Sequence, residues 1–451
     1  MFQVLADRTY GRLFSAQIIA LVGTGLLTVA LGLLAFDIAG DKAGAVLGTA
    51  LAIKMVAYVT VAPIVGAFAA QLPRRAFLIA MDLVRAVIAL SLPFISEVWQ
   101  VYLAVFVLQS ASAAFTPTFQ ATIPDVLTEE EDYTNALSLS RLAYDLESIV
   151  SPMLAAALLT VINFHWLFAG TVVGFLASAA LVLSVTLPVS PAKPRKGGIY
   201  DKTTRGSRIY LATPRLRGLL ALNMAVAMGG SLVIVNTVVI VKGRLGFDDN
   251  AVALALACFG GGSMLSALTL PRVLERFSDR TVMLTAAIFL ATVLGLFSVI
   301  LAANGWSSSP TPTEAGWGLL LATWALLGVG YSATQTPSGR LLRRSAHAED
   351  RPAVFAAQFA LSHACWLIAY PLAGWLGAAL PLGTLAALFA VATFVATVLA
   401  WRLWPAGTAE ALQHDHPDLP DDHPHFKEHG TRHAHPIVID DLHVRWPAST
   451  G

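Results

Sequence analysis

Charged residues are scarce in this chain of 451 residues, and cysteine is nearly absent. Asp, Glu, Lys and Arg make up 13% of the sequence, whereas a water-soluble domain contains about a quarter. The two cysteines, Cys258 and Cys365, lie in different apolar stretches, which excludes a disulfide framework and a thiolate metal site. The 29 basic residues balance 28 acidic ones, so a basic surface for nucleic acid is excluded. The sequence also contains no P-loop, and nothing in it indicates an enzyme.

Long apolar stretches are abundant: 56% of the residues are hydrophobic and the mean hydropathy is +0.68. A helix that crosses a bilayer needs about 20 apolar residues. Uncharged stretches of at least that length are 13–36, 98–124, 166–192, 218–241, 250–271, 281–313, 315–339 and 352–401, the last being long enough for two crossings with a turn near Gly377, Pro381 and Gly383. Stretches 43–71, 76–96 and 135–164 also qualify if isolated charges are allowed. We therefore predict an all-α membrane protein with twelve transmembrane helices.

A polar, basic and Pro-rich segment at 188–214 divides these helices into six and six. Thr116-Pro117 and Thr336-Pro337, near the ends of the predicted fourth and tenth helices, are 220 residues apart and indicate a weak internal repeat. Repeated halves are typical of alternating-access transporters. The predicted parts are a six-helix bundle (1–187), a cytoplasmic linker (188–214), a second six-helix bundle (215–404) and a cytoplasmic tail (405–451).

Lys and Arg are distributed unevenly between the two sets of predicted loops. If the N-terminus lies in the cytoplasm, only Lys42, Lys242 and Arg244 lie in the external loops. Because cytoplasmic loops are enriched in Lys and Arg, we expect both termini to be cytoplasmic. The expected location is the inner membrane of a bacterium, where the lipid bilayer surrounds the helices.

Two loop motifs lie at equivalent points of the two halves. Residues 66–75 read GAFAAQLPRR and match the pattern G-x-x-x-D-R-x-G-R-R, except that Ala70 replaces the Asp. Residues 271–280 read PRVLERFSDR and keep part of the same pattern. On these motifs, residues 9–404 resemble the major facilitator superfamily, which implies two six-helix bundles around a central cavity. Ala70 departs from the family pattern and puts its usual Asp-centred gate in doubt.

Within that superfamily, residues 115–153 look like the branch that contains the enterobactin exporter and bacterial nickel-resistance efflux proteins. The histidine-bearing tail is similar to the His-rich ends of the nickel-resistance members. These resemblances imply export from the cytoplasm, driven by protons that move in the opposite direction. They imply nickel or other divalent cations as the preferred cargo.

The predicted tail contains eight of the chain's eleven histidines, and six of them form His-x-His pairs. Imidazole suits Ni, Zn, Co and Cu(II), so we predict that the tail binds divalent metal. The alternative is a solvated, disordered tail, since Pro, Asp and His cannot build a core. The last stretch, 436–447, is apolar enough to dock, and docking and fraying are both compatible with it. The candidate ligands are His414, His416, His423, His425, His429, His433, His435 and His443.

The predicted fifth helix carries two acidic residues deep in the membrane, Asp145 and Glu147, but only one nearby arginine, Arg141. Intramembrane charges usually face a cavity or one another. Arg141 can neutralise only one carboxylate, so the other is a candidate proton carrier. Lys54 is the one lysine inside a predicted span, and we interpret it as the counter-ion of that second carboxylate. The alternative is that Lys54 belongs to the site and repels cations.

Two further candidates have structural explanations that we favour. Asp82 and Arg85 are spaced i, i+3 on the predicted third helix and are expected to form a structural ion pair, although a role in proton coupling is kept as an alternative. His363, on the predicted eleventh helix, is either hydrogen-bonded within the protein or a proton or metal group facing the cavity.

The family resemblance implies that the first, fourth, seventh and tenth helices line the central cavity. That wall is polar but almost uncharged, and it suits a bulky neutral or amphipathic cargo as well as a weakly held cation. Its candidate residues are Gln17, Thr24, Thr28, Gln109, Ser110, Asn223, Met224, Met228, Asn236, Tyr331 and Gln335.

The sequence thus predicts a proton-coupled exporter of nickel or other divalent cations. An exporter of a siderophore or drug-like organic molecule is the first alternative, and a metal sensor that keeps a transporter fold is the second. We expect no permanently bound cofactor, with Ni(II) as cargo and tail ligand. The expected partners are lipid, protons and a small cargo, and the expected oligomeric state is a monomer.

Overall fold

The computed structural model describes residues 2–68, 73–127, 129–187, 199–303, 314–347, 350–406, 411–415, 432–436, 438–439, 443 and 446. The first half contains η1 (Phe2–Ala6), α1 (Arg8–Ala39), η2 (Gly40–Lys42), α2 (Ala43–Phe68), α3 (Arg74–Ser91), η4 (Leu92–Phe94), α4 (Val98–Val126), α5 (Glu130–Leu159) and α6 (His165–Leu183). The second half contains α7 (Ile199–Ala212), α8 (Pro214–Val238), the π-helix η5 (Val239–Arg244), α9 (Asp249–Leu274), α10 (Asp279–Ala303), α11 (Glu314–Gln335), α12 (Ser338–Arg344), α13 (Arg351–Ala379) and α14 (Leu382–Leu403). The strands β1 (Ala411–Asp415) and β2 (Arg432–Pro436) follow.

The predicted all-α membrane fold is confirmed. Within the described residues, twelve helices have 18 or more residues, six before α7 and six after it. Length and hydropathy alone give ten candidate spans, because α1 and α2 merge into one span and α5 is not among them. The uncharged stretch 352–401 divides into α13 and α14 at Leu380–Pro381, where the turn is predicted. Proline favours an extended conformation in the residue before it, so α13 ends there.

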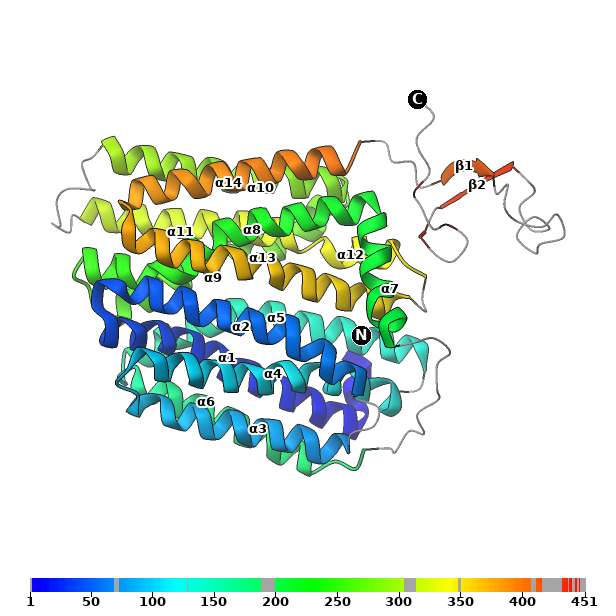
Figure 1. The fold of residues 1–451 in the computed structure, drawn as a ribbon, viewed down its shortest axis with the longest axis horizontal. Helices are drawn as coiled ribbons and strands as arrows, with labels where there is room; N and C mark the ends of the chain where they lie inside the picture. The colour runs from blue at the N-terminus through cyan, green and yellow to red at the C-terminus, as the bar shows by residue number, and fades with distance from the viewer. Residues whose placement is uncertain are drawn as a thin grey trace.

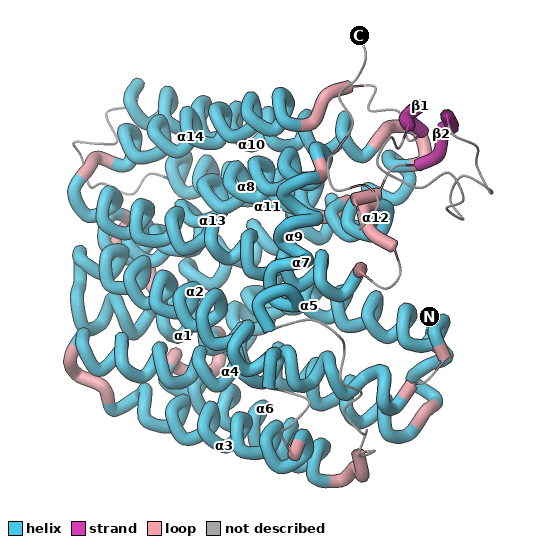
Figure 2. Tube along the Cα trace, turned by 45° about the vertical axis from the view of Figure 1, so that its right-hand side comes forward, coloured by secondary structure: helices cyan, strands magenta, loops and turns pink. Residues whose placement is uncertain are grey.

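The two sets of six helices form two layers that run side by side (Figure 1). The halves meet through α2 against α13 and through α5 against α9. The N-terminus, α7 and the β1–β2 hairpin lie at one end of the helices (Figure 1), which we name the α7 end. The opposite end, where η2 contacts η5, is named the η2 end. Helices account for most of the trace, and the hairpin is the one strand pair in the described part of the chain (Figure 2).

The outward faces of the helices are apolar. Val87, Trp99, Leu268, Val299 and Val391 are each more than 60% exposed although they lie within the long helices. A soluble protein rarely exposes so continuous an apolar surface, whereas lipid tails cover it without cost. The fold therefore places the chain in a lipid bilayer.

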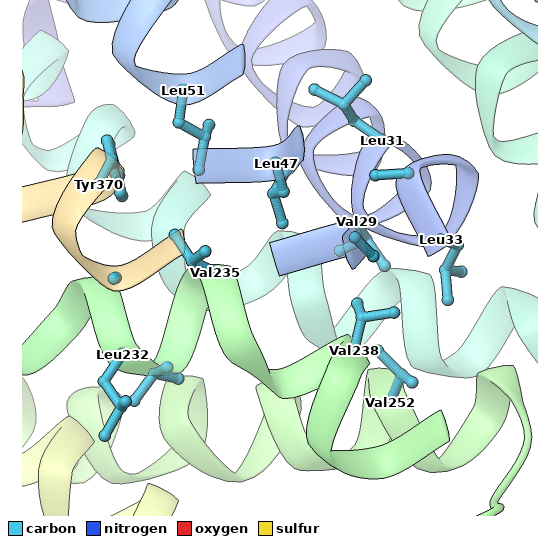
Figure 3. Packing of buried hydrophobic residues seen from close by; sticks show 14 of the residues in the cluster. Val29, Leu31, Leu33, Leu47, Leu51, Leu232, Val235, Val238, Val252 and Tyr370 are labelled. Atoms are coloured by element: carbon cyan, nitrogen blue, oxygen red, sulfur yellow. The ribbon is translucent and has the colours of Figure 1, made fainter. Parts of the chain in front are cut away.

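A buried hydrophobic cluster joins the two halves towards the η2 end. Figure 3 shows Leu47 and Leu51 of α2 close to Val235 of α8 and Tyr370 of α13. Burial of such side chains within protein does not by itself drive association in lipid, since lipid tails are equally apolar. Close packing of these side chains therefore stabilises the contact between the halves.

Glycines allow the backbones of α2 and α13 to touch. A Cβ atom on Gly48 would lie 2.6 Å from the carbonyl oxygen of Tyr370 and 3.0 Å from Cα of Gly374. A Cβ on Gly374 would lie 2.4 Å from the carbonyl oxygen of Gly44. Gly44 and Gly48 form a G-x-x-x-G motif, the spacing that lets transmembrane helices approach closely.

The predicted linker contains an ordered helix, α7, which packs against α13. Arg205 donates two hydrogen bonds to Asp350, from Nε to Oδ1 at 2.6 Å and from Nη2 to Oδ2 at 3.0 Å. A Cβ on Gly206 would lie 2.0 Å from the carbonyl oxygen of Ala353, so the two backbones touch. This part of the segment is therefore bound to the second half. The polar composition that predicts a linker reflects a surface helix, on which Arg208 is exposed and Arg205 binds Asp350.

The last apolar stretch docks rather than frays at the residues that the structure describes. Ile439 is 4% exposed and packs with Ile209 of α7 and Leu341 of α12. The ring of Trp446 lies 5.7 Å from the guanidinium of Arg215, a cation–π contact. His443, a predicted metal ligand, is buried in the same stretch. The described residues of this stretch are thus held against the second half at the α7 end.

Candidate transport site

Two charged residues of the first half lie where the halves meet. Lys54 of α2 and Glu147 of α5 interact electrostatically, and Glu147 also interacts with Tyr370 of α13. Both charged side chains are partly buried. A Cβ on Gly25 of α1 would lie 2.9 Å from Oε1 of Glu147, so the carboxylate lies against the α1 backbone. The groups that lie against this carboxylate or interact with it electrostatically therefore come from both halves.

The structure thus brings together Lys54 and one of the two predicted carboxylates. The side chains of Arg141 and Asp145 lie outside the side chains that the structure describes, so their roles stay predictions. Among the described side chains, Lys54 is the positive charge that acts on Glu147. The role of Lys54 as a counter-ion stays a prediction.

An aromatic stack continues from Lys54 toward the α7 end. The ammonium nitrogen of Lys54 lies 5.8 Å from the ring centroid of Tyr58, and the Tyr58 ring stacks on His363 of α13 at 5.1 Å. Nδ1 of His363 lies 2.6 Å from the carbonyl oxygen of Phe359 and donates to it. This bond within its own helix is consistent with the interpretation that His363 is simply hydrogen-bonded.

The second half contributes an aromatic wall on α9, α11 and α13. Tyr331, a predicted cavity residue, packs edge-to-face on Phe259 with centroids 5.4 Å apart, and Trp366 lies 4.9 Å from Tyr370. Trp366 also covers Gly230 of α8, where a Cβ would lie 2.8 Å from its ring. Sequence reasoning missed this wall. The available signal was the recurrence of aromatic residues and histidine every three or four positions along α13, at 359, 363, 366 and 370.

The predicted polar residues divide into two groups. Gln17 accepts a hydrogen bond from Ser140 at 3.1 Å, and Asn236 donates to the carbonyl oxygen of Ala373 at 3.1 Å, so both join neighbouring helices. Gln335, at the end of α11, is partly buried. By contrast, the buried Asn223 and Gln109 have side-chain atoms without a hydrogen-bond partner in the described part of the protein: Nδ2 and Oδ1 of Asn223 and Oε1 of Gln109.

A pocket opens between α1, α2 and α4, next to the charged pair. Its polar residues are Thr28, Lys54 and Gln109, one from each helix. Its apolar lining is Leu27, Leu31, Leu51, Leu92, Ala104, Val105 and Leu108. The cavity volume is about 10 Å³, room for roughly one water molecule. A divalent cation there would meet the positive charge of Lys54.

The Asp82–Arg85 pair lies elsewhere, inside the first half. The two side chains form an ion pair and are 0% and 5% exposed. Ser178 of α6 donates to Oδ2 of Asp82 at 2.8 Å, and the guanidinium of Arg85 lies 4.3 Å from the Phe115 ring and 4.5 Å from the Phe175 ring. Ser178 and two aromatic rings thus surround the pair, while Nε of Arg85 has no hydrogen-bond partner among the described residues.

The tail histidines are described only in part. β1 and β2 pair antiparallel, with His414 opposite His433 and Leu412 opposite His435. His416, His423, His425 and His429 lie outside the described residues. In the part of the tail and of the helices that the structure covers, no group of three or more His, Cys, Asp or Glu is placed to hold a metal ion.

Comparison with known proteins finds one family whose sequence pattern matches this chain and many solved structures with a similar fold. The sequence profile of the Major Facilitator Superfamily matches residues 13–229 and again residues 219–435. No curated protein sequence matches this chain. The solved nucleoside transporter NupG has a TM-score of 0.63 and 14% identity, over 88% of this chain and 98% of its own.

Two further solved structures are similar. A POT family transporter in complex with a thioalcohol-conjugated peptide gives a TM-score of 0.65 and 13% identity, over 89% of this chain and 97% of its own. A bacterial homologue of the human lysosomal transporter Spinster, inward-facing and unoccupied, gives 0.59 and 13%, over 88% and 95%. At these identities, the similarities show the shared fold and nothing about cargo.

Proposed function

Because the chain belongs to the major facilitator superfamily, and is therefore a multi-pass membrane transporter of a small cargo, we propose that it is a proton-coupled exporter. In this proposal Glu147 carries the proton and Lys54 responds to its charge. The observations that support it are the position of Glu147 Oε1 against Gly25 of α1 and the electrostatic interaction of Glu147 with Lys54 of α2. The proposed setting is a bacterial inner membrane with both termini in the cytoplasm.

The electrostatics of the pair supply a coupling device. While Glu147 is ionised, the two charges compensate each other. A proton on Glu147 leaves the charge of Lys54 uncompensated in surroundings of low dielectric, which is costly. Tyr370 of the second half lies within the field of Glu147. Protonation therefore changes the relative stability of two arrangements of the halves, which is the requirement for alternating access.

The positive charge of Lys54 favours an organic cargo. The lining of its pocket is mainly apolar, and a positively charged lysine disfavours a divalent cation. The nickel cargo predicted from the tail and from the family branch gains no support from the charged pair. A siderophore or drug-like molecule does not require an anionic site, and we place it first.

Metal transport is the second candidate, and the pairing of β1 with β2 favours it. Facing residues of an antiparallel pair have Cα atoms about 4.5 to 5.5 Å apart, a spacing that lets two imidazoles reach one metal ion. His414 and His433 face each other in this register. In this candidate the tail collects nickel at the α7 end and delivers it to the transport path.

Efflux of two cargoes from the same proteoliposomes tests the proposal. Vesicles are loaded with both Ni(II) and the neutral dye N-phenyl-naphthylamine. The outside solution is then made acidic, and the release of both cargoes is measured. Dye movement that depends on the pH jump supports the organic exporter, and nickel movement supports the second candidate. If neither cargo nor protons move, the sensor alternative is favoured and the exporter proposal fails.

We expect the full chain to bind Ni(II) at pH 7.5 and to lose it as the pH falls through about 6, because only neutral imidazole ligates metal. Below that pH the imidazoles are protonated, so binding is present at high pH and absent at low pH. Calorimetry measures it, with a chain that ends at residue 404 as the control. That shortened chain should still transport. Equal heats from both chains would contradict metal binding by the tail.

A further inference from the structure

We propose that the first half carries, at the α7 end, a binding site for the phosphate group of an anionic phospholipid. The site is formed by Arg12 of α1 and Arg75 of α3 at the end of α6. This inference does not depend on the cargo or on proton coupling. Three observations support it: two guanidinium groups on adjacent carbonyls, lipid-facing side chains beside them, and a similar arrangement in the second half.

The two arginines converge on the end of α6. Nη1 of Arg12 donates to the carbonyl oxygen of Ser184 at 2.8 Å, and Nη2 of Arg75 donates to the carbonyl oxygen of Leu183. These carbonyls belong to adjacent residues, so the two guanidinium groups lie close to each other. Among the described residues, neither arginine forms a salt bridge with a carboxylate. Two like charges held together in this way attract an anionic group.

The end of α6 does not neutralise the two arginines. The C-terminus of a helix carries about half a negative charge, whereas the guanidinium groups carry two positive charges, so an excess of about one and a half positive charges is left. Arg12 is exposed, so this excess is accessible from outside the protein. Each guanidinium has five N–H groups, more than its bond to α6 uses. A phosphate diester supplies a negative charge and oxygen acceptors that guanidinium groups bind well.

The lipid-facing surface of α6 ends at these arginines. Along this helix Val173, Leu176 and Leu183 are 65%, 46% and 57% exposed, as expected of side chains that lipid tails cover. Leu183 is the last residue of α6, and its carbonyl is the one that Arg75 binds. One phospholipid can therefore place its tails on this surface and its phosphate on the arginines. A phosphate ion in solution would make only the second contact.

The second half has a similar arrangement. The two loop motifs end at Arg75 and Arg280, and each arginine is the second residue of its helix, α3 or α10. Arg280 donates from Nε to the carbonyl oxygen of Trp404 at 2.6 Å and from Nη2 to that of Trp401 at 3.4 Å, at the end of α14. The side chain of Trp401 is 59% exposed, and tryptophan is enriched at the level of lipid headgroups. An arginine thus meets the end of a lipid-facing helix in both halves.

Two phospholipids with the same tails test the site by native mass spectrometry of the full chain released from detergent. Dioleoylphosphatidylglycerol is anionic, whereas the choline of dioleoylphosphatidylcholine balances its own phosphate. We expect phosphatidylglycerol to bind more tightly, and equal affinity for both lipids would overturn the inference. Added inorganic phosphate should not displace phosphatidylglycerol. Displacement would assign the arginines to phosphate in solution and contradict a lipid site.

Arg12→Gln combined with Arg75→Gln removes both charges and keeps an N–H donor at each position. We expect phosphatidylglycerol binding to weaken roughly fivefold for each arginine, the effect of one basic residue at a membrane surface, and phosphatidylcholine binding to stay unchanged. The matched control is Arg272→Gln with Arg276→Gln, which removes the same charge from exposed positions at the end of α9 and just after it. Equal losses in the two double variants would indicate nonspecific attraction and overturn the inference.

A variant that keeps both charges separates lipid binding from the capping of α6. Arg12→Lys with Arg75→Lys loses the guanidinium geometry, so its Tm is expected to fall, but it should still prefer phosphatidylglycerol. Loss of that preference in the folded lysine variant would contradict recognition by charge. In the parent chain, added salt should reduce the preference, because exposed charges are screened, and a preference that salt leaves unchanged would also overturn the inference. These measurements use neither cargo nor a proton gradient, so failure of the proposed role of Glu147 would leave them unaffected.

Discussion

Replacing Glu147 with glutamine abolishes transport driven by a pH gradient. Glutamine has almost the same shape as glutamate but cannot bind and release a proton, so the site loses its two charge states. Exchange of cargo across the membrane without a gradient should persist, because that reaction needs no proton. Proteoliposomes that contain purified variants give both rates. The predicted companion carboxylate, Asp145, is tested in parallel by Asp145→Asn.

A second variant distinguishes coupling from structure at Glu147. In Glu147→Gln the charge of Lys54 loses its compensating carboxylate, and removal of one member of a partly buried charge pair is expected to be destabilising. The double variant Glu147→Gln with Lys54→Met removes both charges and should regain stability while still failing to respond to pH. If the double variant transports with normal pH dependence, Glu147 is not the proton carrier. Asp82 is then the next candidate.

Asp82→Ala should have the largest effect on stability. It leaves Arg85 charged and almost fully buried between two aromatic rings, and breaking a buried pair in this way costs about 3 to 5 kcal/mol. Thermal unfolding in lipid or detergent measures the loss. The comparison is with Asp82→Leu combined with Arg85→Met, which removes both charges and keeps the volume.

The double variant at positions 82 and 85 also decides the function of the pair. A structural pair predicts that this variant recovers most of the lost stability and transports like the parent protein. A folded double variant that fails to transport would instead assign the pair a part in coupling. Stability of Asp82→Ala equal to that of the parent would show that Arg85 does not need its carboxylate.

The sequence predicts the elements of this fold better than their contacts. Hydropathy locates the transmembrane stretches because a bilayer requires about 20 apolar residues for each crossing. Pro381 marks the turn between α13 and α14, because proline restricts the residue before it. The interaction of Lys54 with a carboxylate follows from the cost of isolated charges in lipid. Each of these features depends on residues close in the sequence or on a general energetic rule.

The aromatic wall and the pocket could not be predicted in the same way. Phe259, Tyr331 and Trp366 come from three helices, and their packing depends on how those helices pair, which periodicity does not encode. That Oε1 of Gln109 has no hydrogen-bond partner among the described residues is visible only once α1, α2 and α4 are placed together. The helix α7 was missed because its composition is polar, while its attachment depends on Asp350, far along the chain.

The glycine contact between α2 and α13 bears on the kinetics of switching. Gly48 and Gly374 bring backbone against backbone, so few side chains interdigitate at this point. Sliding or tilting of one half against the other there requires few rotamer changes, which keeps that contribution to the activation barrier small. The rate of interconversion is then governed by contacts with larger side chains, such as the stack of Tyr58 on His363. The turnover number, rather than cargo affinity, is therefore expected to depend on that stack and little on the glycine contact.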